Sequence, residues 1–115
     1  MMTEIFAQGD LLIERVGDVT PSGKVEENAE GVALVLLEGE ATGHRHATYD
    51  RVTMFRDDAL AREIPAGLYL GHLKITEGSA TVVHDEHAPL TLLEGTYRVR
   101  RQRELEPKDA VLVAD

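Results

Sequence analysis

The chain has no cysteine and no tryptophan, and its only large aromatic residues are two phenylalanines and three tyrosines. Without cysteine it can form no disulfide, no thiolate nucleophile and no cysteine-ligated zinc site, so a metal site would have to use histidine and carboxylate ligands. With so few aromatic residues, valine, leucine and isoleucine must fill the core, which is typical of strands.

Long apolar runs are also missing from the sequence. No run reaches membrane-spanning length, and no basic segment is followed by the apolar stretch of a secretion signal. We therefore expect a soluble cytoplasmic protein that does not associate with membranes.

Basic residues are few: 12 lysines and arginines stand against 21 acidic residues, which gives a net charge of −9. Such a charge repels polyanions, so general nucleic-acid binding is not expected. The hydrophobic share of 43% is ordinary for a globular protein, and 115 residues suffice for one core. We therefore expect a single β domain over residues 1–115.

Short apolar runs separated by glycine-rich turns predict strands, because a turn about every ten residues without a helical period is typical of all-β proteins. The fold class predicted is a small antiparallel sandwich or barrel, similar to a cupin or jelly roll. The predicted strands are 11–16, 32–37, 44–49, 52–56, 68–75, 80–83, 90–93, 96–105 and 110–114.

Two segments carry more specific expectations. Residues 32–37 are apolar throughout, which indicates a strand in the middle of the sheet. Residues 17–31 are rich in proline, glycine, serine and acidic residues, which predicts an exposed, mobile loop. A sheet this small must pair or protect its open edges, and symmetric assembly is a common solution, so we expect a homo-oligomer.

Four of the five histidines occur in two close pairs. His44 and His46 share one face of a predicted strand, because side chains two residues apart point the same way, while His84 and His87 lie in a polar loop. Neutral imidazole is a common metal ligand, so the four together would suit divalent zinc, iron, nickel or copper. The alternative is that both pairs are ordinary solvated residues. The fifth histidine, His72, is expected at the surface or in an interface.

Acidic neighbours of the two pairs would supply oxygen ligands or orient the rings: Asp50, Asp85 and Glu86. The same residues also allow metal-free chemistry, with His44 or His84 as a base, Asp50 or Glu86 orienting it, and Arg98 stabilising an anionic intermediate.

Four of the twelve basic residues fall within six positions: Arg98, Arg100, Arg101 and Arg103. Guanidinium groups bind carboxylates and phosphates in a bidentate manner, so a small anionic ligand beside the histidines is one interpretation. The other is that these arginines form ion pairs with acidic residues across a subunit interface.

These observations leave two hypotheses for the function. The first is a metal-dependent or acid–base enzyme acting on a polar or anionic small molecule. The second is a non-catalytic homo-oligomeric binding or assembly module whose histidines and arginines make subunit contacts.

The segment Gly39-Glu40-Ala41-Thr42-Gly43-His44-Arg45-His46 resembles the first cupin motif, in which a glycine precedes His-x-His on a jelly-roll strand. The glycine spacing is one residue shorter than in that motif, and no glutamate follows the histidines. A clear second motif is absent as well, so His84 or His87 would have to provide its late histidine. The resemblance implies a cupin-like fold and metal site.

Over most of its length the chain resembles a family of small uncharacterised bacterial proteins. The resemblance rests on Gln8-Gly9-Asp10, Gly43-His44-x-His46, His84-x-Glu86-His87-x-Pro89 and the segment GTYRVRRQRE at 95–104. It implies a single small β domain of bacterial type and no particular activity.

Overall fold

A computed structural model describes residues 4–38, 44–61, 64–65 and 67–102 of the chain. Its strands are β1 (Ile5–Gln8), β2 (Leu11–Val16), β3 (Lys24–Glu27), β4 (Leu34–Glu38), β5 (Arg45–Thr48), β6 (Thr53–Arg56), β7 (Tyr69–Val83) and β8 (Leu90–Arg101). The described part also contains one short 3₁₀ helix, Asp58–Leu60, and none of its helices has the length and apolar character needed to cross a membrane.

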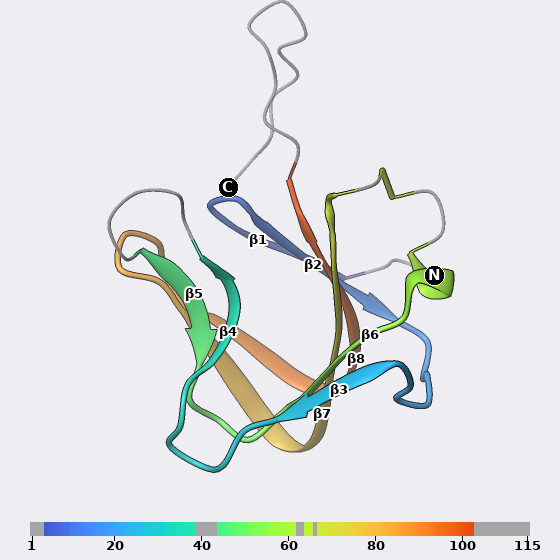
Figure 1. Ribbon diagram of the computed structural model, residues 1–115. Coiled ribbons are helices and arrows are strands. Elements are labelled where there is room, and N and C mark those ends of the chain that lie inside the picture. The colour runs from blue at the N-terminus through green and yellow to red at the C-terminus, as the bar shows by residue number, and fades with distance from the viewer. Residues whose placement is uncertain (1–3, 39–43, 62–63, 66, 103–115) are drawn as a thin grey trace, which may run out of the picture.

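The strands pair antiparallel in a single sheet that does not close into a barrel. The main path runs β1-β2-β8-β7-β5-β4, while β6 pairs with β7 and β3 pairs with β6. The early part of β7 pairs with β6, and its last residues pair with β5. The long β7–β8 hairpin therefore joins two portions of the sheet, one that contains β6 and one that contains β5. In Figure 1, β4 and β5 lie at the left of the view and the β1–β2 hairpin crosses its middle.

The all-β antiparallel fold class predicted from the sequence is therefore confirmed. The physical cause is the alternation of apolar and polar residues along the strands, which buries one face of the sheet. The barrel alternative does not hold in closed form, and the cupin-like connectivity stays a prediction.

The breaks predicted between strands 68–75 and 80–83 and between strands 90–93 and 96–105, at Glu77-Gly78 and Glu94-Gly95, are bends inside the continuous strands β7 and β8. The register shifts between Ile75 and Ser79, where β7 curves from one portion of the sheet to the other. Glycine occurs in β-bulges as well as in turns. The two glycines do mark changes of chain direction, but interpreting them as turns that end a strand was wrong.

The core lies between the two portions of the curved sheet. Tyr97 and Val99, expected to face inward, are completely buried. Members of one apolar cluster come from both portions: Leu11, Ile13, Leu34, Leu36, Leu37, Val52, Leu73, Ile75, Ala80, Val82, Leu92, Tyr97 and Val99. Burying this cluster is the main term that favours the fold, at about 25 cal/mol for each Å² of apolar surface.

The position predicted for the apolar run 32–37 is wrong, because β4 lies at the end of the strand path and not in its middle. The register of β4 against β5 shifts between Val35 and Leu37. This bulge allows both Leu36 and Leu37 to be buried, although they are neighbours in the chain. The continuous apolar run at 32–37 is therefore explained by a bulged strand at the edge of the sheet.

Residues 17–31 are largely exposed, as expected, but they contain strand β3, which pairs with β6. Charged residues make up most of β3, so no apolar pattern marked it. The sequence also did not predict β1, and the strand predicted at 110–114 lies outside the described residues.

Candidate functional site

Four imidazole rings from two distant segments meet beside the β1–β2 turn. β5 pairs with the end of β7 through Ala47 opposite Val83. Since the strands are antiparallel, the residues before Ala47 run alongside those after Val83, and this brings the two histidine pairs together. The ring centroids lie 4.3 Å apart for His46 and His84, 4.8 Å for His84 and His87, 5.8 Å for His44 and His84, and 6.5 Å for His46 and His87.

His46 is the buried member of this histidine cluster (His44, His46, His84 and His87), with 3% of its surface exposed. Its Nδ1 atom lies 2.7 Å from Gln8 Oε1. Burial lowers the pKa of His46 from its usual 6.5 to about 4, and the nearby His84 and His87 rings act in the same direction. The ring is therefore neutral near pH 7, which is the form that binds metals.

Glu86 contacts two of the other rings. Its Oε1 lies 3.0 Å from His44 Nδ1, and its backbone N–H donates to His84 Nδ1 at 3.0 Å. Of the acidic residues proposed as ring-orienting partners, Glu86 is thus the one that contacts the cluster. A carboxylate bound to Nδ1 orients an imidazole and leaves its Nε2 atom for a ligand.

The β1–β2 turn packs closely against the cluster and explains the glycine at position 9. A Cβ atom on Gly9 would lie 2.7 Å from His87 Nε2, and the backbone φ of +56° also favours glycine. Gln102 holds this turn from the end of β8, since its side chain donates to Gly9 O at 2.7 Å. In the sequence, Gln8-Gly9-Asp10 stood out as part of the family resemblance. Nothing indicated that this turn packs against the histidines.

The spacing of the rings suits a shared ion, because two imidazoles bound to one tetrahedral metal have centroids about 5 Å apart. Within the described ranges, however, no three or more histidine or acidic side chains have ligand atoms already placed to hold an ion. His84 shows one reason: its Nδ1 accepts a hydrogen bond, so the neutral ring carries its proton on Nε2. Coordination by all four rings would require this ring to rotate.

Arg98 is not brought to the cluster. It lies on the outer face of β8, opposite Glu14 and His72, and its guanidinium forms an ion pair with the Glu14 carboxylate, with Nε 2.9 Å from Oε1. Its expected role toward an anionic intermediate is therefore not supported by its position. Among its neighbours, Arg100 donates to the backbone of Arg101, and Arg103 lies outside the described residues.

The expectation that His72 lies at the surface is wrong. It is buried, stacked on Phe55 of β6 with centroids 5.5 Å apart, and its Nδ1 lies 2.8 Å from the Tyr69 hydroxyl. The sequence showed a polar residue opposite the core face, and it could not show that the outer face has a cover of its own.

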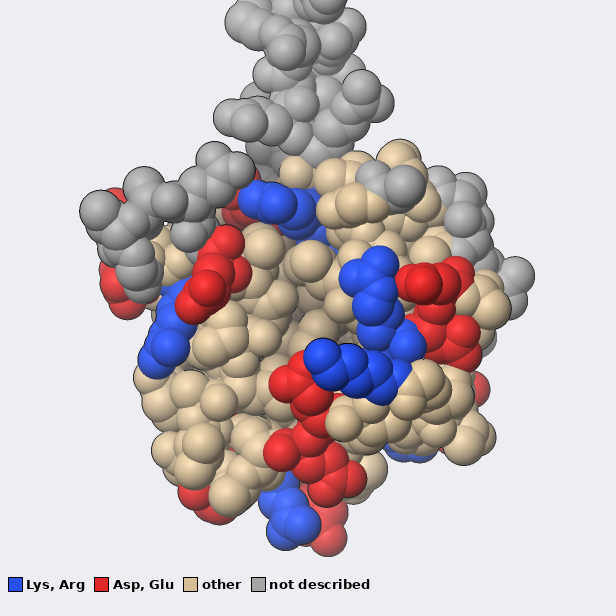
Figure 2. All heavy atoms as spheres, in the orientation of Figure 1, with Lys and Arg blue, Asp and Glu red and all other residues tan. Residues whose placement is uncertain are grey.

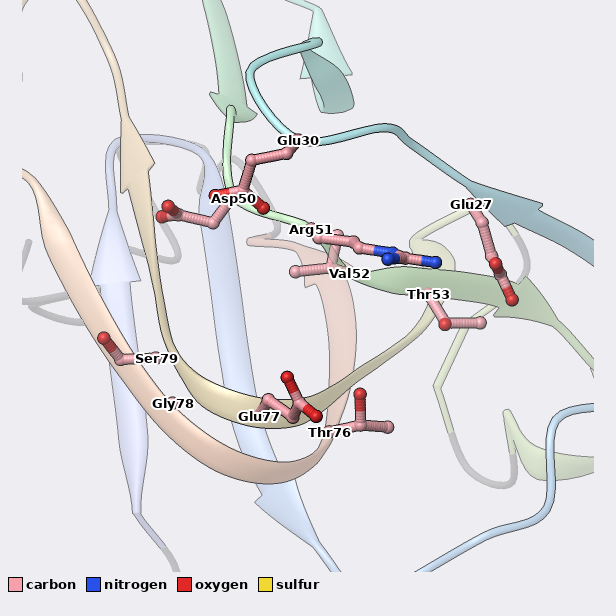
Figure 3. Close-up of a pocket in the computed structure, with 10 residues that line it drawn as sticks. All are labelled: Glu27, Glu30, Asp50, Arg51, Val52, Thr53, Thr76, Glu77, Gly78 and Ser79. Atoms are coloured by element: carbon pink, nitrogen blue, oxygen red, sulfur yellow. The ribbon is translucent and has the colours of Figure 1, made fainter.

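Asp50 also differs from expectation. Its carboxylate accepts a hydrogen bond from Thr81 N at 2.7 Å and lines a hollow of about 780 Å³ that contains no histidine. Figure 3 shows this hollow with Glu27 and Glu77 at its rim and Arg51 extending along it. Asp50 therefore fixes the backbone of β7 and does not orient the imidazoles.

Charged side chains on the face seen in Figure 2 are mixed, with acidic groups next to basic ones and no broad basic patch.

Comparison with known proteins gives a family but no activity. A family model described as "Domain of unknown function (DUF8820)" matches residues 7–102, which include the histidine cluster and all strands except the start of β1. No curated protein and no solved structure matched the chain.

Proposed function

We propose that this chain, which belongs to the DUF8820 family, binds a divalent transition-metal ion at the histidine cluster. The observation that carries the proposal is the convergence of four imidazoles from β5 and the β7–β8 loop, with centroid separations of 4.3 to 6.5 Å. Imidazole nitrogen suits zinc, ferrous iron, nickel and copper, and the chain offers no thiolate to compete.

The neighbours of the rings support this assignment. Glu86 lies at Nδ1 of His44 and Gln8 at Nδ1 of His46, as the partners of metal-bound histidines commonly do. Burial keeps His46 neutral, and the surrounding net negative charge attracts a cation. Rotation of the His84 ring, whose hydrogen bond to the Glu86 backbone is exposed, would complete the ligand set at low cost.

A metal held by three of these imidazoles would keep one position for a water molecule or an exogenous ligand, and it would act there as a Lewis acid. A polar or anionic small molecule is the substrate class that such a centre would take. The open side of the cluster is formed by His44 and His87, which are partly exposed.

The test is metal binding by tag-free protein. Dialysis against zinc or cobalt, followed by elemental analysis, should give about one ion per chain for the native sequence, because these ligands bind in the folded state. A His44→Ala and His46→Ala double variant should lose the ion. His72→Gln removes a histidine outside the cluster and should retain it. Absence of bound metal in the native chain, or full binding by the double variant, would contradict the proposal.

A second candidate, a homo-oligomeric module, is favoured by the strand edges. β1 and β4 each have one neighbour in the strand path, and residues 5–8 and 34–37 carry no charge. Edge strands that stay unpaired usually carry proline, lysine or other charged residues, so these edges suit pairing with a second copy. This candidate is compatible with a metal centre in each subunit.

A further inference from the structure

We propose that Gln8 is a positioning residue that selects Nε2 of His46 as the atom that binds the cation. The inference rests on the proposed metal-binding function and deepens it, because it names the ligand atom and the group that sets it. Gln8 lies at the end of β1, and only 2% of its surface is exposed.

The orientation of the Gln8 amide follows from its partners. The Nε2 atom of Gln8 lies 3.0 Å from Val82 O and 2.8 Å from Ala88 O. Both partners are carbonyl oxygens, which can only accept, so the NH₂ group must face them. The amide oxygen is thereby directed at His46, and the reversed orientation would place oxygen against two carbonyls.

This fixed orientation determines the tautomer of His46. Oε1 of Gln8 can only accept, and it lies 2.7 Å from His46 Nδ1. The Nδ1 atom must therefore be the donor, and a neutral ring then has its lone pair on Nε2. Only 3% of the His46 surface is exposed, and burial disfavours the charged ring. His46 is thus prepared as an Nε2 ligand before any ion arrives.

Gln8 also connects the segments that build the site. Through one side chain it binds β5 at His46, the end of β7 at Val82 and the following loop at Ala88. A purely structural role would need only the two donated hydrogen bonds. The tautomer of His46 depends on the hydrogen bond that Gln8 Oε1 accepts from it. An experiment that reads the tautomer therefore distinguishes a positioning role of Gln8 from a purely structural one.

The experiment measures the tautomer directly on the metal-free chain. The ¹⁵N chemical shifts of the two His46 ring nitrogens distinguish a protonated from an unprotonated atom at pH values well above the His46 pKa. We expect the native chain to show protonated Nδ1 and unprotonated Nε2. A predominantly Nε2–H ring in the native chain would overturn the proposal without requiring any variant to fold.

Two substitutions separate the acceptor from the donors. Gln8→Glu keeps an oxygen that accepts from Nδ1–H, so the Nδ1–H tautomer should persist even if stability falls. Gln8→Met keeps the length of the side chain but removes the strong acceptor, so an Nε2–H population should appear. Retention of a pure Nδ1–H ring in a folded Gln8→Met variant would also overturn the proposal.

Gln102→Met is the matched control, because it removes an amide that binds the same turn at Gly9 O but does not contact His46. It should leave the tautomer unchanged.

A second measurement compares metal binding. Gln8→Met should weaken zinc or cobalt binding about 10- to 100-fold relative to the native chain, as loss of a ligand-orienting group does. If the native chain binds no metal, the proposed function fails, while the tautomer result still decides the role of Gln8.

Discussion

Two histidines of this chain are buried, and their surroundings differ in kind. His46 lies among other imidazoles and is hydrogen-bonded to Gln8. His72 lies between Phe55 and Tyr69 on the opposite face of the sheet. Burial lowers the pKa of His72, the Arg98 cation acts in the same direction, and Asp57 opposes them. His72 therefore contributes to the pH dependence of stability without belonging to the site.

The sign of that dependence follows from proton linkage. The unfolded chain protonates His72 near pH 6.5, but the folded chain does so only at lower pH, so the unfolded state binds more protons in between. The contribution of His72 is fully present above pH 6.5 and is lost as the pH falls toward its folded pKa. We predict that His72→Phe, which keeps the stack on Phe55, reduces the loss of stability between about pH 7 and pH 5. Urea unfolding of the metal-free chain at both pH values measures this, and an unchanged difference between them would contradict it.

The sequence alone singled out the four histidines of the cluster, because potential metal ligands are few in this chain, and it named Glu86 as one of three acidic residues that would bind a metal or orient the rings. It could not show that the two pairs converge, since that depends on the register of β5 against β7. Gln8 was missed because an amide acquires a role only from its partners, which lie 38, 74 and 80 residues away in the chain. The role expected of Arg98 is not supported by its position beside Glu14, because a cluster of arginines gives no information on which carboxylates the fold supplies.

At the scale of the elements, the long β7–β8 hairpin determines where the site can form. Its bends carry β7 from β6 to β5, and so bring the 84–87 loop to the start of β5. The sequence placed nearly every apolar strand correctly, since burial imposes a period of two. It divided β7 and β8 into shorter strands, because a glycine inside a bend and a glycine in a turn look alike in sequence.

Two glycines of β7 allow a test of these bends. A Cβ atom on Gly71, where φ is +147°, would lie 2.9 Å from the backbone oxygen of Phe55, whereas one on Gly78, where φ is +69°, meets nothing within 4 Å. We predict that Gly71→Ala lowers the free energy of unfolding by about 3 kcal/mol, from backbone strain plus overpacking against β6. Gly78→Ala should cost about 1 kcal/mol, from strain alone. Urea unfolding of both variants measures the difference. Equal losses of the free energy of unfolding would show that the contact between a Cβ at position 71 and the Phe55 backbone does not add to the strain.

At the scale of the whole molecule, the sheet ends in edges of different character. β3 consists largely of charged residues, as is usual for an edge that stays in solvent, whereas β1 has none and exposes 58% of Ile5. The overall negative charge limits association with polyanions but does not protect this edge. An uncharged edge strand favours pairing between copies of the chain.

We therefore predict that the native chain sediments as an oligomer larger than its 12.7 kDa subunit. Ile5→Lys places a charge on the β1 edge and should lower the sedimenting mass. Val25→Lys is the control, because Val25 is similarly exposed, at 46%, but lies on the charged strand β3. A monomeric native chain in analytical ultracentrifugation, or equal effects of the two substitutions, would contradict the prediction.

The pairing of β2 with β8 has a consequence for how the protein is made. Leu11 lies opposite Arg101, so β2 is synthesised well before its partner strand β8. Until that partner is synthesised, β2 can pair only with β1, and an isolated hairpin is marginally stable in water. The β1–β2 hairpin can therefore join the rest of the sheet only after β8 has been synthesised, whereas the pairings β3–β6, β4–β5, β5–β7 and β6–β7 need only strands that precede β8.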